Sequence, residues 1–274
     1  MHPILFTING FAVHSYGVIM ALGIVAGVSY AAYIGRKRGL DPYDMSEVGL
    51  WTVIVGLLGA RLAYIIQHTG YYIQHYDLIL NFRRGGIAIQ GALLFGFAAT
   101  AWTCRRRGIK MLNGLDVYIS PVLLGMAIGR VGCVMQGCCY GSPCAEGLPW
   151  GITYPDALHI ACVPRHPSQI YEALLDIALI FAVNRVFKNA RFYGQAFWTG
   201  IAGYGVVRFI TEFFRECDSA PIAGLSLAQW AALLFVGIGL CGALGKFGHQ
   251  EIEAEVSSEP KEADKCAADE DAEP

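Results

Sequence analysis

Residues 13–34 read VHSYGVIMALGIVAGVSYAAYI, a stretch long and apolar enough to cross a bilayer as one helix. Comparable apolar stretches recur at 48–67, 86–103, 115–133, 170–187, 195–210 and 227–244. A backbone in lipid must satisfy its own hydrogen bonds, so helices are the expected form. The sequence therefore predicts an all-α, polytopic membrane protein with about seven transmembrane helices.

The composition agrees with this fold class. Of the 274 residues, 55% are hydrophobic and only 15% are charged, and the mean hydropathy is +0.44. In a soluble domain roughly a quarter of the residues are charged. The apolar composition indicates the lipid bilayer as a partner, and the formal net charge of only -2 gives no indication of nucleic acid binding.

The basic residues predict the orientation in the membrane. They cluster after the first, third, fifth and seventh apolar stretches, and the opposite loops hold fewer. The clustered residues are Arg36, Lys37, Arg38, Arg105, Arg106, Arg107, Lys110, Arg185, Lys188, Arg191 and Lys246, against Arg83, Arg84, Arg165 and Arg215 on the other side. Because positively charged loops stay in the cytoplasm, we expect the N-terminus outside and the C-terminus in the cytoplasm.

Residues 1–247 are predicted to form one transmembrane domain with outer loops at 68–85 and 138–168. Residues 1–11 lack the basic start, apolar core and cleavage site of a signal peptide, so the first apolar stretch is expected to stay as a helix. Residues 248–274 are acidic and nearly free of large apolar side chains. They are expected to form a disordered cytoplasmic tail.

Several ionisable residues fall within the predicted spans, where each costs several kcal/mol unless it is paired or lines a wet cavity. They are Arg61, Asp116, Arg130, Glu172, Asp176, Arg208 and Glu212. For Arg61, Asp116 and Asp176, a structural ion pair between helices is as good an interpretation as a functional one.

Two of the arginines predict an anion site. Tyr204, Arg208 and Glu212 share one helix face because they are four residues apart, and Arg130 lies in the glycine-rich GMAIGRVG. A guanidinium matches phosphate oxygens with its fork of donors. If both arginines converge near the outer surface, they could hold a phospholipid head group; the alternative is a structural Arg–Glu pair.

Seven motifs in a fixed order carry a family resemblance. They are HSYGVIMALG, GARLAYII, GGIAIQGALLFG, GRVGCVMQGCCYG, RHPSQIYEALL, GYGVVRFITEFFRE and LSLAQW, and they extend over about residues 6–230. The chain resembles the prolipoprotein diacylglyceryl transferases. This resemblance implies a bacterial inner-membrane enzyme without a cofactor, which moves the diacylglyceryl group of phosphatidylglycerol to the lipobox cysteine of a prolipoprotein. The products would be a thioether and glycerol phosphate.

The resemblance also implies site residues. By it, Arg130 and Arg208 bind the phosphate, and Tyr16 and Tyr204 shape the head-group pocket. The expected catalytic residues are Arg130, Arg208, Tyr204 and Glu212, and the expected substrate-binding residues are Tyr16, Arg61, Gln90, Arg130, Gly141 and His166. Tyr171 matches a further family position.

The sequence departs from the family pattern at four positions. Gln90 stands where the family has a histidine, Cys133 and Gln136 stand for asparagines, and Cys138 stands for an acid. A glutamine cannot act as a base. A substitute could be Glu212, Tyr204, His14, His166 or a nearby thiolate, or the two arginines could lower the pKa of the acceptor thiol. These departures favour a second hypothesis, a non-catalytic or altered-substrate relative that binds anionic phospholipid. A third hypothesis is a small seven-span transporter, against which stand the lack of a clear internal repeat and the length of the family match.

The cysteines Cys133, Cys138, Cys139 and Cys144 form the pattern C-x4-C-C-x4-C. This spacing is not a usual zinc pattern, so we expect no metal. Disulfides on the outer face are the favoured interpretation, with Cys162 or Cys217 as further partners. The alternative is that small residues are simply tolerated at tight turns.

Overall fold

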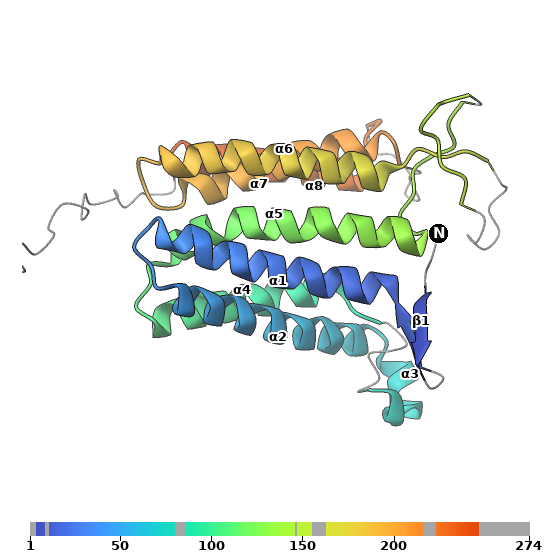
Figure 1. Cartoon of the computed structure of the whole chain (residues 1–274), viewed down its shortest axis with the longest axis horizontal. Coiled ribbons are helices and arrows are strands. Elements are labelled where there is room, and N and C mark those ends of the chain that lie inside the picture. Colours follow the sequence, from blue (N-terminus) through green and yellow to red (C-terminus); the bar gives the residue numbers. More distant parts are fainter. Residues whose placement is uncertain are drawn as a thin grey trace, which may run out of the picture.

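The computed structural model describes residues 4–8, 11–79, 86–145, 147–154, 163–215 and 223–246, and within these ranges seven long helices account for most of the chain (Figure 1). They are α1 Ser15–Arg36, α2 Pro42–Gln67, α4 Ile89–Arg106, α5 Met111–Gln136, α6 Ser168–Lys188, α7 Gln195–Glu212 and α8 Leu227–Ala243. Each overlaps one predicted apolar stretch. The predicted tail at 248–274 lies outside the described residues, as do parts of both predicted outer loops.

The chain is not purely helical. Strands β1 (Ile4–Ile8) and β2 (Phe11–His14) pair antiparallel in front of α1. The first helix begins at Ser15, two residues after the approximate predicted start, because Val13 and His14 belong to β2. A short helix α3 (Thr69–Gln74) and the 3-10 turn η1 (Tyr76–Leu78) follow α2.

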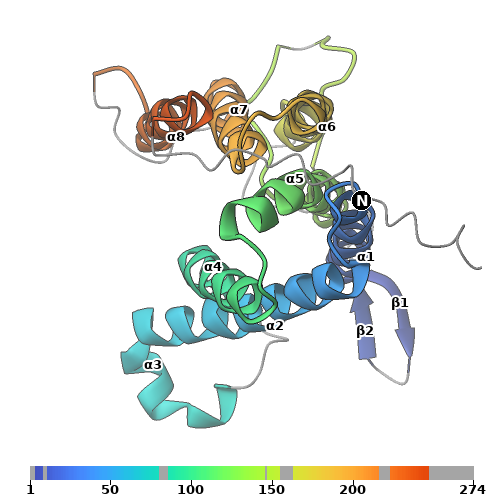
Figure 2. The same cartoon turned by 90° about the vertical axis from the view of Figure 1, so that its left-hand side faces the viewer.

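Helix α5 lies at the centre of the bundle. It packs against α1 on one side and against α6 and α7 on the other, while α2 pairs with α4 and α7 pairs with α8. Figures 1 and 2 show the result: two groups of helices, α1–α2–α4 and α6–α7–α8, with α5 between them. Residues of α5 can therefore reach both groups.

Local signals fix where several helices begin. Asp41 caps α2 by accepting a 2.7 Å hydrogen bond from the Tyr43 amide, and Pro42 occupies the first turn, where its missing N–H is not needed. Ser226 and Gln229 form a reciprocal capping box at the start of α8. These caps fix the first residues of α2 and α8, which the apolar pattern does not specify.

Asp116 caps another helix from a distance. Its carboxylate accepts hydrogen bonds of 2.7 Å from the Gly194 amide and 2.8 Å from the Phe197 amide, at the N-terminus of α7. Arg38 lies 3.9 Å away. A buried carboxylate at a helix N-terminus compensates exposed amides and the helix dipole, so the structure supports the structural interpretation of Asp116.

Glycines allow the helices to approach closely. A Cβ atom on Gly91 of α4 would overlap the Gly59 carbonyl oxygen of α2. On the other side of the bundle, a Cβ on Gly239 of α8 would overlap Ala202 of α7. Small residues at helix contacts are typical of membrane bundles, where close packing replaces the hydrophobic effect.

The apolar core cluster and the Arg130–Glu172 pair occupy opposite ends of the bundle, whereas Asp116 lies at the same end as the core. Core residues come from the end of α1, the start of α2 and the start of α5, as with Ala31, Met45 and Val117. The buried ionisable residues Arg130 and Glu172 come instead from the end of α5 and the start of α6. Because neighbouring helices alternate in direction, these positions meet at the end of the bundle that carries the β-hairpin.

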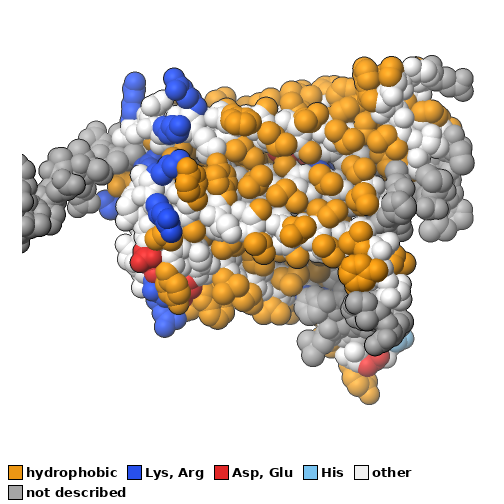
Figure 3. All heavy atoms as spheres, in the orientation of Figure 1, with side chains coloured by type: hydrophobic (Ala, Val, Ile, Leu, Met, Phe, Trp, Pro, Cys, Tyr) orange, Lys and Arg blue, Asp and Glu red, His pale blue; other side chains and the backbone are white. Residues whose placement is uncertain are grey.

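The outer surface suits lipid. Helices α1, α2 and α5 are long and apolar enough to cross a membrane by length and composition, and α8 is a shorter apolar helix. Figure 3 shows a broad apolar surface over the middle of the molecule and Lys and Arg side chains gathered at one end. Leu22 and Val25 on α1 are more than half exposed, so apolar side chains face outward as well as inward.

Candidate functional site

Two arginines from different helices meet at one carboxylate. Arg130 Nη2 on α5 donates to Glu172 Oε1 on α6, and Arg208 Nη1 on α7 lies 3.4 Å from Glu172 Oε2. The Glu172 side chain is 1% exposed, whereas the two arginine side chains are about 20% exposed. The structure thus brings the two predicted arginines together and adds a buried acid between them.

Arg208 is held from its own helix as well. Its Nη2 lies 3.1 Å from Glu212 Oε2, one turn further along α7. Glu212 in turn accepts a 3.3 Å hydrogen bond from the Ser226 hydroxyl at the start of α8. Tyr204 lies one turn before Arg208, is half-buried, and interacts electrostatically with both arginines. The guanidinium of Arg208 is therefore fixed by two carboxylates and a neighbouring helix terminus.

Asp176 lies one turn beyond Glu172 on α6 and is fully buried. Within the described ranges neither of its carboxylate oxygens has a hydrogen-bond partner. It interacts electrostatically with Glu172, Arg130 and Arg208. The structure places this acid behind the arginine cluster and does not give it the ion pair that the sequence left open.

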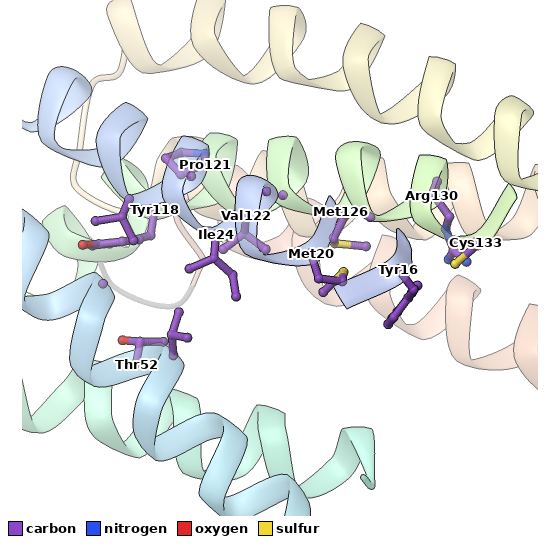
Figure 4. Close-up of a pocket in the computed structure, with 17 residues that line it drawn as sticks. Tyr16, Met20, Ile24, Thr52, Tyr118, Pro121, Val122, Met126, Arg130 and Cys133 are labelled. Carbon is purple, nitrogen blue, oxygen red and sulfur yellow. The ribbon is translucent and has the colours of Figure 1, made fainter. Parts of the chain in front are cut away.

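An elongated cavity of about 420 Å³ leads away from Arg130 between α1, α2 and α5. Figure 4 shows Tyr16, Arg130 and Cys133 at one end of it, with Tyr118 and Thr52 at the other. Apolar side chains and glycines form most of the wall between the ends. A cation at the mouth of an apolar cavity can bind an amphiphile with an anionic head and an apolar chain.

Three thiols gather beside this mouth. The Sγ atoms of Cys133, Cys138 and Cys139 all lie within 4.8 Å of one another, and none of them is in a disulfide. The expected disulfides are therefore not found among the described cysteines, and Cys144 is also free. The proposed further partners Cys162 and Cys217 lie outside the described residues.

The thiols and nearby cations affect one another. Hydrogen bonds from Cys133 and Cys138 hold the pKa of Cys139, in the loop after α5, below its usual range, and the charges of Arg215 and Arg130 act in the same direction. A low pKa favours the thiolate form, which is the form that reacts with electrophiles and binds metals.

The loop that carries these cysteines is fastened to the start of α6. Ser168 donates a 3.0 Å hydrogen bond to the Cys139 carbonyl oxygen, and the Gln169 side-chain amide donates a 2.7 Å bond to the Cys138 carbonyl oxygen. Both side chains are about 1% exposed. The sequence suggested only a helix start for Ser168 and Gln169, since nothing in it pairs them with the cysteine loop.

Gly141 and His166 pack on the end of α7 in the same loop region. The Gly141 amide donates a 2.9 Å bond to the His166 carbonyl oxygen, and a Cβ on Gly141 would overlap the Phe214 carbonyl oxygen. The His166 ring lies 3.2 Å from the Tyr171 hydroxyl and packs edge-on against Phe214. Gly141 permits a close backbone approach, and His166 contacts an aromatic cluster.

Arg61 and Gln90 are not gathered with the two central arginines. Arg61 is 4% exposed and donates hydrogen bonds to the carbonyl oxygens of Ile79, Leu78 and Gly86, at 2.9, 2.6 and 2.8 Å. It fastens the connection between α2 and α4. Gln90 is an exposed residue in the first turn of α4, a helix that packs mainly against α2.

Glu172 was not among the site residues predicted from the sequence. Its signal was present, because an acid inside an apolar stretch needs a partner. The spacing along one helix could pair Arg208 with Glu212, but it could not show that Glu172 on another helix bridges two arginines.

The sequence of the chain is similar to those of one family of membrane transferases. The family profile described as prolipoprotein diacylglyceryl transferase matches residues 3–244. A phosphatidylglycerol–prolipoprotein diacylglyceryl transferase of Clostridium tetani is 31% identical over 246 residues, covering 88% of this chain and 96% of the relative. Proteins with the same name from Clostridioides difficile and Geobacter sulfurreducens are 32% and 33% identical, covering 86% and 79% of this chain and 92% and 83% of the relatives.

Proposed function

Because the chain belongs to the prolipoprotein diacylglyceryl transferase family, we propose that it transfers the diacylglyceryl group of phosphatidylglycerol to the lipobox cysteine of prolipoproteins. A thioether forms and glycerol phosphate leaves. The names of the relatives give phosphatidylglycerol and a prolipoprotein as the two substrates. The enzyme is a membrane transferase, and its partners are an anionic phospholipid and a precursor signal peptide.

The observation that carries this proposal is that Arg130 and Arg208 meet at Glu172, with Arg130 also at one end of an apolar cavity. Arg130 lines the cavity itself, so an acyl chain in the cavity would bring the head-group phosphate to its guanidinium. Each guanidinium has five N–H donors, and Glu172 and Glu212 occupy only part of this set. Donors therefore remain for phosphate oxygens.

The chemistry needs positive charge where negative charge develops. When the acceptor sulfur attacks the glycerol carbon, the carbon–oxygen bond breaks and the electron pair leaves on the phosphate oxygen. Arg130 and Arg208 stabilise that charge from fixed positions, which avoids reorganisation during the reaction. Tyr204 and Glu212 orient Arg208, and Tyr16 forms part of the head-group pocket.

The other predicted site residues act by positioning. Arg61 holds the connection that leads into α4, and Gly141 and His166 hold the outer loop against α7. Gln90 lies on α4, apart from the two central arginines, and has no useful basicity, so we assign it no role as a base.

We also propose that all seven long helices span the bacterial cell membrane, with the β-hairpin outside and the C-terminus in the cytoplasm. The basic end of the molecule supports this orientation (Figure 3). The candidate site then lies at the outer leaflet, where lipid and precursor meet. A green fluorescent protein fused behind the C-terminus should fluoresce; absence of fluorescence from a well-expressed fusion would contradict the orientation.

The test of function uses the full-length protein in phosphatidylglycerol vesicles with a lipobox peptide. Mass spectrometry should show a gain of one diacylglyceryl unit on the cysteine peptide and none on its serine analogue. Arg130→Lys and Arg208→Lys keep the positive charge but lose the planar N–H donors of the guanidinium. Each substitution should lower kcat/KM at least 100-fold. Arg107→Lys, which changes an exposed arginine paired with Asp44, is the matched control and should stay within about threefold. Full activity of either central variant would overturn the proposal.

A further inference from the structure

The three clustered thiols have the geometry of a metal site. In a site with metal–sulfur bonds of about 2.3 Å, neighbouring sulfur atoms stand roughly 3.8–4.0 Å apart. The Sγ atoms of Cys133, Cys138 and Cys139 already lie within 4.8 Å of one another. Small side-chain rotations would therefore bring all three onto one ion. Cys144, the fourth cysteine of the sequence pattern, is not part of this group.

The backbone is built to hold this arrangement. Gly137 caps the end of helix α5 in the left-handed conformation, with φ of 73°, and the Cys138 amide donates a 3.1 Å hydrogen bond to the Cys133 carbonyl oxygen. Cys139 also adopts a positive φ of 61°. This turn returns the loop onto the last turn of α5 and brings Cys138 and Cys139 to Cys133.

Buried groups outside the cluster fix the loop. The side chains of Ser168 and Gln169 bond to the carbonyl oxygens of Cys139 and Cys138, as described above. Tyr154 donates a further hydrogen bond of 3.3 Å to the Gln169 side chain. Outer contacts of this kind orient metal ligands in proteins, and here they act on the two cysteines that leave the helix.

The cluster also lies where the reaction needs a sulfur. Cys133 and Arg130 line the same end of the cavity, and Tyr16 interacts electrostatically with all three thiols and with Arg130. An ion held by the thiols would therefore lie at the same end of the cavity as Arg130, where we place the lipid phosphate.

We propose that Cys133, Cys138 and Cys139 bind one thiophilic divalent cation of the zinc class, and that its fourth position binds the sulfur of the acceptor cysteine. This inference rests on the proposed function and revises the sequence expectation of no metal. Three protein ligands with one open position are the arrangement of catalytic zinc, and thiolate ligands favour zinc among the common divalent ions.

The step is balanced without an oxidant or reductant. The acceptor S–H bond breaks when sulfur binds the cation, because a coordinated thiol is deprotonated, and the proton passes to water. The carbon–sulfur bond then forms, the carbon–oxygen bond breaks, and glycerol phosphate leaves with the electron pair and takes up a proton from water. The metal thus supplies what the Gln90 position lacks, since glutamine is not a base.

The first experiment measures metal independently of turnover. Full-length protein without a polyhistidine tag is purified in detergent under reducing conditions, and its metal content is measured by elemental mass spectrometry. We expect about one zinc per chain and, after exchange, a thiolate-to-cobalt charge-transfer band with Co²⁺. Cys133→Ser, Cys138→Ser and Cys139→Ser should each bind Co²⁺ at least tenfold more weakly. Cys144→Ser and Cys241→Ser are the matched controls and should bind as the parent does.

The second experiment tests the open position. A lipobox peptide with cysteine should change the visible spectrum of the cobalt protein, and the serine analogue should leave it unchanged. No bound metal, or a disulfide among the three cysteines in protein isolated from membranes, would overturn the site. A spectrum that is insensitive to the cysteine peptide would overturn the role of the fourth position.

The two proposals fail in different ways. If metal-free protein modifies the peptide at the full rate, the transferase proposal stands and the metal inference is wrong. If metal-loaded protein never modifies the peptide while a relative does so in the same vesicles, the proposed function is wrong. Metal content and the serine variants still decide the binding site in that case.

Discussion

Replacing Glu172 by glutamine tests the buried charge between the two arginines. The substitution keeps the size of the side chain, so no cavity forms, but it removes the negative charge that bridges Arg130 and Arg208. Two unit charges about 4 Å apart interact by roughly 4 kcal/mol at an effective dielectric constant of 20. Breaking a buried pair costs about 3–5 kcal/mol.

For Glu172→Gln we expect a loss of stability at the lower end of that range. Both arginine side chains are about a fifth exposed, and glutamine still accepts a hydrogen bond. A loss of about 3 kcal/mol corresponds to a fall in Tm of roughly 6–12 °C. Asp44→Asn is the matched control, because the Arg107–Asp44 pair at 2.8 Å is partly exposed. An exposed pair contributes about 0–1 kcal/mol.

Tryptophan fluorescence on heating at a fixed scan rate in a neutral detergent gives the apparent Tm. Added phosphatidylglycerol should raise the Tm of Glu172→Gln more than that of the parent, because its phosphate takes the place of the lost carboxylate. Diacylglycerol, which has the acyl chains without the phosphate, should not do so. The reasoning is refuted if Glu172→Gln falls no further than Asp44→Asn, or if both lipids act alike.

Three further substitutions test packing, the cavity and a helix cap. Gly91→Ala should lower the free energy of unfolding by about 1–3 kcal/mol, because the new Cβ forces α4 away from Gly59 of α2. Gly237→Ala, which has open space around it, should leave the apparent Tm unchanged. Equal effects of the two substitutions would contradict close α2–α4 packing. Gly125→Leu should fill the cavity and raise the KM for phosphatidylglycerol at least tenfold in a vesicle assay. Gly237→Leu is the control and should leave this KM unchanged. An unaltered KM for Gly125→Leu would show that the acyl chain lies elsewhere. Asp116→Ala should lower stability by about 1–3 kcal/mol through two orphaned amides, and an unchanged Tm would contradict its role as a cap.

The sequence predicted the long helices but not all their ends. Helix α2 begins at Pro42, six residues before the predicted start at 48, because Asp41 caps a polar first turn that an apolar pattern ignores. The β-hairpin was missed, although Asn9-Gly10 between apolar residues is a strong turn signal. A search for membrane-length stretches does not detect strands of four or five residues.

The site was only partly predictable for a similar reason. Tyr204, Arg208 and Glu212 share one helix, so their spacing alone places them on one face. The Arg130–Glu172 pair and the Gln169–Cys138 bond join different elements, and only the packed bundle defines such contacts. The cysteine spacing suggested a pattern of four residues, whereas the fold gathers Cys133, Cys138 and Cys139 and leaves Cys144 outside the group.

Five glycines line the cavity: Gly23, Gly27, Gly49, Gly125 and Gly129. A glycine has no side chain to rotate. At these five positions the main chain therefore sets the width of the cavity, and rotamer changes cannot widen it. A straight hydrocarbon can extend further past these positions, whereas a chain bent by a cis double bond needs more width there and requires side chains elsewhere in the wall to move. The enzyme should therefore tolerate variation in acyl length better than variation in acyl shape, and membrane unsaturation should slow it.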